Sequence, residues 1–168
     1  FGGVTPALGT EAERFFSEDR IDAEPRRGKP SGAFCVWPST RVPGFVLVTW
    51  TGQLRDLVFL THELGHGTNW ALAARAQTDN SLKQGIATAE VPAKFAELLL
   101  VEHLLSTDED LGRALLAREL DHVVMSAYMF AAFARFEQAA YALRAEGQAL
   151  SADRLNALCG AAVAKVWG

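Results

Sequence analysis

Two histidines four positions apart, His62 and His66, lie in a segment whose apolar spacing predicts a helix from about Gln53 to Ala76. Residues i and i+4 of a helix lie on one face, one turn apart, so both imidazoles can reach a single ion. The background of this helix is nearly apolar, and a buried imidazole pair has little structural reason to be there. The spacing therefore predicts that the chain folds around a helix that binds a metal.

Between these histidines lie Glu63, Leu64 and Gly65, which complete the pattern H-E-x-x-H. Glu63 is next in sequence to a ligand, so its carboxylate is expected to reach a water molecule on the metal rather than the metal itself. In that position it can act as a general base and later as a general acid. Gly65 is expected to leave room beside the metal. The pentapeptide also occurs by chance, and its position on an apolar helix favours the metal interpretation.

The third ligand decides the class of site. No histidine follows His66 until His103, which excludes the metzincin pattern. Glu90 lies 24 residues after His66 at the start of a helix predicted from about Ala89 to Leu105. Two antiparallel helices would bring it to the metal. The alternative is an ordinary acid that complements a helix N-terminus.

Glu97 lies seven residues after Glu90, about two turns along the same helical face. It could accept the second N–H of a ligand histidine and so fix its tautomer. The alternative is a solvated surface carboxylate.

The remaining pattern predicts a mainly α fold, a helical zincin-type core with one small antiparallel β element near the N-terminus. Thr10 and Glu13 resemble a capping box that opens a short helix ending near Glu18. The basic triplet Arg26, Arg27 and Lys29 is interpreted as solvated surface. The other predicted elements are strands Ala33–Trp37 and Phe45–Trp50, a long helix Glu109–Ala145 stopped by Gly147, and a last helix from Ala152 to about Val166.

Composition and net charge limit the kinds of partner that the chain can bind. The 168 residues suit one domain, 49% are hydrophobic, and the net charge of −4 argues against nucleic acid or an anionic membrane surface. No apolar run is long enough to span a membrane. Cys35 and Cys159 could pair, but two reduced, buried thiols in a cytosolic protein are the simpler interpretation.

Two segments resemble a known family. Leu60-Thr61-His62-Glu63-Leu64-Gly65-His66-Gly67 and Thr88-Ala89-Glu90-Val91-Pro92-Ala93-Lys94-Phe95-Ala96-Glu97 are similar to the M3 metallopeptidases, the thimet oligopeptidase and oligoendopeptidase F group. The resemblance implies one Zn²⁺ held by His62, His66 and Glu90, water activation by Glu63, and a supporting carboxylate at Glu97. It also implies a mainly helical, cytoplasmic peptidase with a deep channel that cleaves short peptides.

One family feature has no match here. A later segment with His and Tyr, which closes over the substrate and stabilises the oxyanion, is not found, and Tyr128 and Tyr141 do not fit it. We therefore expect residues 1–168 to form one domain that is the core fragment of a larger catalytic domain. Its partners would be short peptides and remaining segments of the same protein or a second chain. The alternative function is an inert zinc-binding fragment or degenerate relative; an aminopeptidase is disfavoured because no Gly-x-Met-Glu-Asn segment is present.

Overall fold

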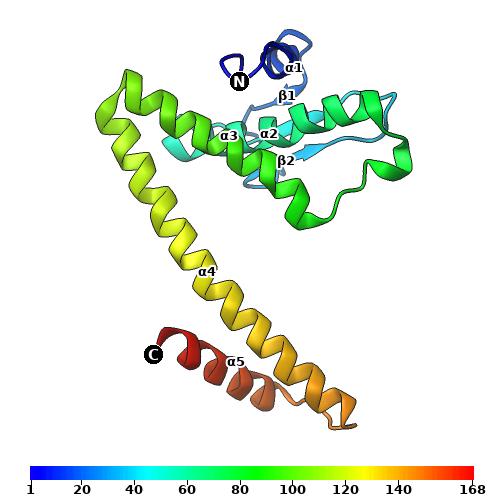
Figure 1. The fold of residues 1–168 in the computed structure, drawn as a ribbon, viewed down its shortest axis with the longest axis vertical. Helices are drawn as coiled ribbons and strands as arrows, with labels where there is room; N and C mark the ends of the chain where they lie inside the picture. Colours follow the sequence, from blue (N-terminus) through cyan, green and yellow to red (C-terminus); the bar gives the residue numbers. More distant parts are fainter. The chain divides into compact units, whose positions relative to one another are not determined.

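The structure, a computed structural model, describes residues 1–168 and divides into two compact units, residues 1–112 and 113–168. Helices dominate, as predicted, and three short strands lie near the N-terminus (Figure 1). The elements are α1 (Pro6–Ser17), β1 (Ile21–Asp22), β2 (Ala33–Val36), β3 (Phe45–Val48), α2 (Leu54–Ala76), a 3₁₀ turn (Asp79–Ser81), α3 (Ile86–Thr107), α4 (Glu109–Ala145) and α5 (Ala152–Trp167).

In the first unit, α2 packs against α3 and against the sheet. The sheet order is β1-β3-β2; β2 and β3 are antiparallel, with Ala33 opposite Val48, which confirms the predicted pair. A third strand, the two-residue β1, pairs in parallel with β3 and was not predicted from the sequence. Phe15, Val46 and Leu64 form the buried core between α1, β3 and α2.

The start of α2 is fixed by Asp56. Its carboxylate accepts hydrogen bonds from the Thr51 N–H at 2.6 Å, the Thr51 hydroxyl at 2.7 Å and the Gln53 N–H at 3.2 Å. Gly52 lies between these donors with a φ of 81°, a conformation that residues with a side chain rarely adopt. Because the donors at a helix start are otherwise unpaired, this arrangement sets where α2 begins, eight residues before His62.

Two predicted helix starts are wrong. Helix α1 begins at Pro6 with Thr5 as its cap, whose hydroxyl accepts the Leu8 N–H at 3.2 Å, so Thr10 lies inside the helix. Pro6 brings a helical φ and lacks the N–H that the first turn leaves unpaired, and it therefore starts the helix earlier. Helix α3 begins at Ile86 rather than near Ala89, which places Pro92 in its interior instead of its first turn.

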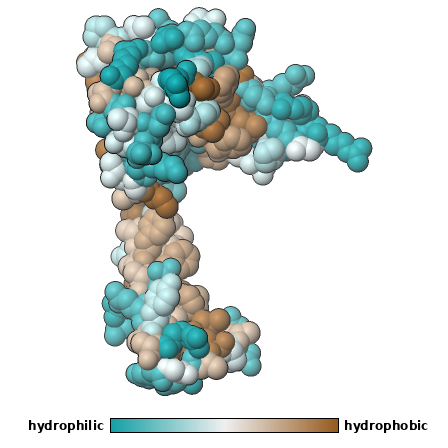
Figure 2. All heavy atoms as spheres, turned by 90° about the vertical axis from the view of Figure 1, so that its right-hand side faces the viewer, coloured by the Kyte–Doolittle hydropathy of each residue, from teal (hydrophilic) through white to brown (hydrophobic).

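The second unit contains most of α4 and all of α5. The predicted bounds of α4 are confirmed, and Gly147 follows it with a φ of 78°. The rings of Tyr128 and Trp167 lie 5.0 Å apart and connect the two helices. Many apolar side chains of α4 are exposed, among them Leu120, Val123, Val124, Met125 and Phe130 (Figure 2). None of the helices has the length and apolarity that a membrane crossing requires.

Gly65 lies where α2 and α3 come closest. A Cβ atom at this position would lie 2.6 Å from the Pro92 carbonyl oxygen, 2.7 Å from the Ala93 Cα and 2.9 Å from the Ala96 Cβ. The glycine therefore serves the contact between the two helices. The sequence analysis had assigned it to space beside the metal.

We expect Gly65→Ala to destabilise the first unit by about 1–3 kcal/mol, because the backbone of α3 must move to admit the methyl group. Gly160→Ala is the matched control, since Gly160 lies in α5 with open space around its Cα. That change should be neutral or stabilising by up to about 1 kcal/mol. Urea denaturation followed by circular dichroism measures both, and equal effects would contradict the close-contact interpretation.

Candidate metal centre

His62, His66 and Glu90 come together where α2 faces α3. Their ligand atoms all lie within 4.8 Å of one another. The His62 Nε2 lies 3.3 Å from one carboxylate oxygen of Glu90, and the His66 Nε2 lies 3.7 Å from the other. A tetrahedral zinc ion with bonds of about 2.1 Å separates its ligand atoms by about 3.4 Å. The three residues therefore fit a single zinc ion.

Glu97 lies on the other side of His62. Its Oε1 is 2.5 Å from the His62 Nδ1, and its Oε2 accepts a hydrogen bond from the Lys94 Nζ at 2.8 Å. The Glu97 side chain is buried and comes from the same helix as Glu90. Because Nδ1 is engaged by a carboxylate, the His62 ring is held with Nε2 directed toward Glu90, the arrangement typical of a metal-ligating histidine.

Glu63 lies buried on the side of α2 that faces the sheet, only 8% exposed. The backbone N–H of Cys35 in β2 donates a hydrogen bond to its carboxylate. Burial raises the pKa of Glu63, opposed by the charge of His62 and by the Cys35 N–H and assisted by Glu90 and Glu97. A carboxylate with a raised pKa, next in sequence to one imidazole of the cluster, has the properties required of a general base.

The two imidazoles differ electrostatically. Burial by itself lowers the pKa of His62, but the hydrogen bond to Glu97 and the charges of Glu63, Glu97 and Glu90 raise it overall. Burial lowers the pKa of His66, and the charge of His62 lowers it further. The neutral form of His66, which binds metals, is thus favoured. Three carboxylates around two imidazoles also favour the binding of a divalent cation.

Trp70 is a residue of this centre that was not predicted from the sequence as part of the site. Its ring stacks on the His66 imidazole with 5.7 Å between centroids and 22° between planes. Since Trp70 follows His66 by one helical turn, the same i,i+4 rule that paired the histidines could have found it.

Nearby, the Asn69 side-chain amide donates a hydrogen bond to the Gln84 side chain at 3.3 Å and so connects α2 to the segment before α3.

The fold and the residue cluster together define a class: mainly helical proteins with an H-E-x-x-H helix and a glutamate from the following helix at one candidate metal site. Within that class the chain belongs to peptidase family M3, whose family model matches residues 7–167.

The relatives and solved structures agree with this membership. Chromosomal oligoendopeptidase F of Lactococcus lactis subsp. cremoris is 36% identical over 155 residues, which cover 91% of this chain and 26% of the relative. A protein of Chlamydophila abortus described as a peptidase superimposes with a TM-score of 0.75 at 23% identity, over 98% of this chain and 28% of that one. The chain thus spans about a quarter of the length of the curated relative.

We expect Glu97→Gln to weaken metal binding by about 10- to 100-fold. The neutral amide makes a weaker hydrogen bond to the His62 Nδ1 and so makes the His62 Nε2 a weaker metal ligand. Competition with a chromogenic zinc chelator measures the affinity. Glu102→Gln is the matched control, an exposed glutamate on the same helix. Equal affinities for the two variants would show that Glu97 does not support the site.

A second prediction concerns Cys35, which is a free thiol, as is Cys159. Burial, with a contribution from the Glu63 charge, raises the pKa of Cys35 to about 12. At pH 8 only about one thiol in 10,000 would then be a thiolate, whereas an ordinary cysteine is about one quarter ionised. Ellman's reagent should therefore modify the native Cys159→Ser variant slowly, and guanidinium chloride should restore full reactivity. Rapid modification of native Cys159→Ser would contradict the assignment.

Proposed function

We propose that this chain forms the metal-binding core of a zinc-dependent endopeptidase that hydrolyses short peptides. The observation that carries the proposal is the convergence of His62, His66 and Glu90, whose ligand atoms lie within 4.8 Å of one another. Membership of peptidase family M3 and the similarity to oligoendopeptidase F support peptide hydrolysis as the reaction. The donor set of two imidazoles and one carboxylate favours zinc and leaves a coordination position for water or substrate.

Each residue has a separate task in this proposal. A zinc ion held by His62, His66 and Glu90 would supply Lewis-acid polarisation of the peptide carbonyl and lower the pKa of water. Glu63 would accept a proton from the attacking water and donate it to the departing amine nitrogen. Glu97 would keep the His62 Nδ1 occupied, so that its Nε2 stays available, and Trp70 would limit rotation of the His66 ring.

The proposal concerns a core rather than the full catalytic apparatus. The chain spans about a quarter of its curated relative, so the groups that close over a substrate would come from remaining segments or a second chain. The organisation of residues 1–168 as a single domain and a cytoplasmic location stay predictions. The competing function is a folded but inert zinc-binding fragment or degenerate relative that lacks the substrate-closing segment with His and Tyr.

The test of the enzyme hypothesis is Glu63→Gln in the full-length protein that carries this segment. We expect one zinc per chain in both forms and a loss of peptide hydrolysis of at least about 1,000-fold in the variant, since the group that moves the proton is gone. Metal content is measured by atomic emission and hydrolysis with a quenched fluorescent peptide. Peptide cleavage retained by Glu63→Gln would refute the assigned role.

Metal dependence separates the two candidate functions. His66→Ala should lose the zinc, because only two ligands remain, whereas Glu63→Gln should keep it. If the isolated chain cleaves the quenched peptide and a chelator abolishes the cleavage, the fragment itself is an enzyme. If the full-length protein binds zinc but hydrolyses no peptide in any condition, the inert interpretation is correct.

A further inference from the structure

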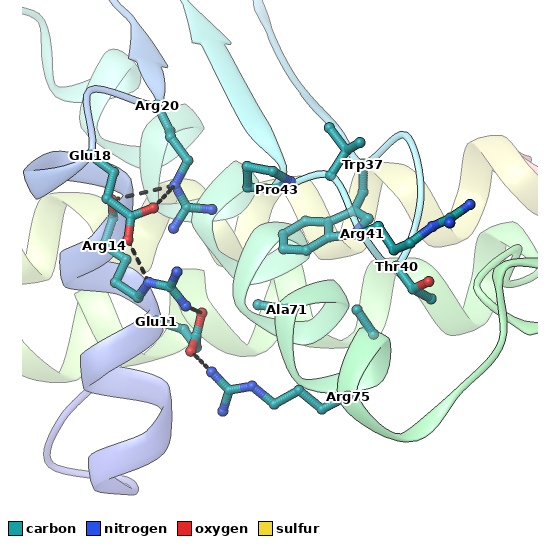
Figure 3. Close-up of a pocket in the computed structure, with 12 residues that line it drawn as sticks. Glu11, Arg14, Glu18, Arg20, Trp37, Thr40, Arg41, Pro43, Ala71 and Arg75 are labelled. Carbon is teal, nitrogen blue, oxygen red and sulfur yellow. Dashed lines mark hydrogen bonds and ion pairs between the residues drawn. The ribbon is translucent and has the colours of Figure 1, made fainter.

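A second polar site lies on the first unit, away from the candidate metal ligands. It is a hollow of about 260 Å³ between α1, the segment after β2 and the last turns of α2. Its wall contains four arginines, two glutamates and Trp37 (Figure 3). A volume of this size suits a small group of a few heavy atoms rather than a nucleotide.

Arg20 lies at the inner wall of this hollow with a donor that has no acceptor. The residue is only 3% exposed, yet its Nη2 makes no hydrogen bond. Its Nε lies 3.2 Å from a Glu18 carboxylate oxygen and 3.4 Å from the Arg14 carbonyl oxygen, and its Nη1 lies 3.5 Å from the Gly44 carbonyl oxygen. The guanidinium also lies over the Phe15 ring, 4.4 Å from its centroid. Figure 3 shows the guanidinium directed toward the space beside Arg14 and Pro43. A buried guanidinium donor without an acceptor is costly.

Trp37, from the opposite wall, has a second buried donor of this kind, since its indole Nε1 has no hydrogen-bond partner. Arg20 and Trp37, the two residues with a buried, unpaired side-chain N–H donor, thus both line this hollow. An ordered water can accept one such bond, but it brings no negative charge. An oxyanion accepts several bonds and neutralises a buried cation as well.

The charges in the wall favour the same ligand. Glu11 is paired with Arg14 and Arg75, and Glu18 is paired with Arg14 and Arg20. The two carboxylates are therefore shared among three arginines. Burial lowers the pKa of Arg20, with Glu18 opposing the change, so its charge is under-compensated in this position.

We propose that this hollow binds an oxyanion, a carboxylate or phosphate group, which accepts hydrogen bonds from the Arg20 Nη2 and the Trp37 Nε1. The group can belong to a free small anion or to an acidic side chain of a polypeptide, and both present the same oxygens. Its role is to complete the arginine cluster that joins α1 to the end of α2. The site needs no metal, so its test is independent of the test of the proposed peptidase function.

The test is a titration of the purified chain in the presence of a chelator and at constant ionic strength. Inorganic phosphate and succinate represent free anions, and a capped Ala-Glu-Ala peptide represents the polypeptide source, with Ala-Gln-Ala as its blank. At least one of the anionic probes should change tryptophan fluorescence saturably. It should also raise the unfolding midpoint by about 3 °C at ten times its dissociation constant.

Matched variants test whether the response to anions comes from this hollow. Arg75→Gln and Trp37→Phe should each weaken anion binding at least about 5-fold, because one removes a charge of the wall and the other an N–H donor. Arg55→Gln is the control: it is also on α2 and its side chain is 59% exposed against 56% for Arg75, but it lies outside the hollow. The proposal is overturned if no anionic probe gives a saturable response, or if Arg75→Gln and Arg55→Gln respond alike.

Discussion

The contact between α2 and α3 at Gly65 controls the distance of every candidate ligand from every other. Because Gly65 has no side chain, the backbone of α3 at Pro92 and Ala93 can lie directly against α2. The two helices run antiparallel, so His62 meets Glu97 while His66, one turn later, meets Glu90. A wider spacing by the thickness of one methyl group would separate the imidazoles from both carboxylates.

The two polar sites of the first unit place opposite charges around the same helix. Near the middle of α2, three carboxylates surround two imidazoles, an arrangement that favours a cation. Near its end, Arg75 belongs to a cluster in which arginines outnumber glutamates. Both clusters border a core of Phe15, Val46 and Leu64, where low polarity strengthens each electrostatic interaction. The apolar core thus strengthens the attraction of each cluster for an ion of opposite charge.

Local spacing explains which parts of the structure could be predicted. The i,i+4 rule placed His62 and His66 on one face of α2. The seven-residue interval placed Glu90 and Glu97 on one face of α3. The helix predicted from Glu109 to Ala145 and stopped by Gly147 has the bounds of α4 in the structure. By contrast, Thr5-Pro6 and Thr10 both resemble helix starts, and only the packed structure decides between them. Lys29 was misjudged as solvated: its Nζ is buried and donates to the Asp22, Glu24 and Val48 carbonyl oxygens, partners that lie up to 19 residues away.

Burial distinguishes the three glutamates of the candidate site. The Glu97 side chain is 5% exposed and held by His62 and Lys94, so it is suited to orienting a ring rather than to exchanging ligands. The Glu90 side chain is 45% exposed, so a metal ion could reach it from solvent. Glu63 is buried against β2, where a raised pKa suits proton transfer. In the proposed centre, a ligand must be reachable from solvent, whereas a group that orients a histidine ring must stay fixed. Helix α3 meets both requirements, because Glu90 lies near its exposed start and Glu97 in its buried middle.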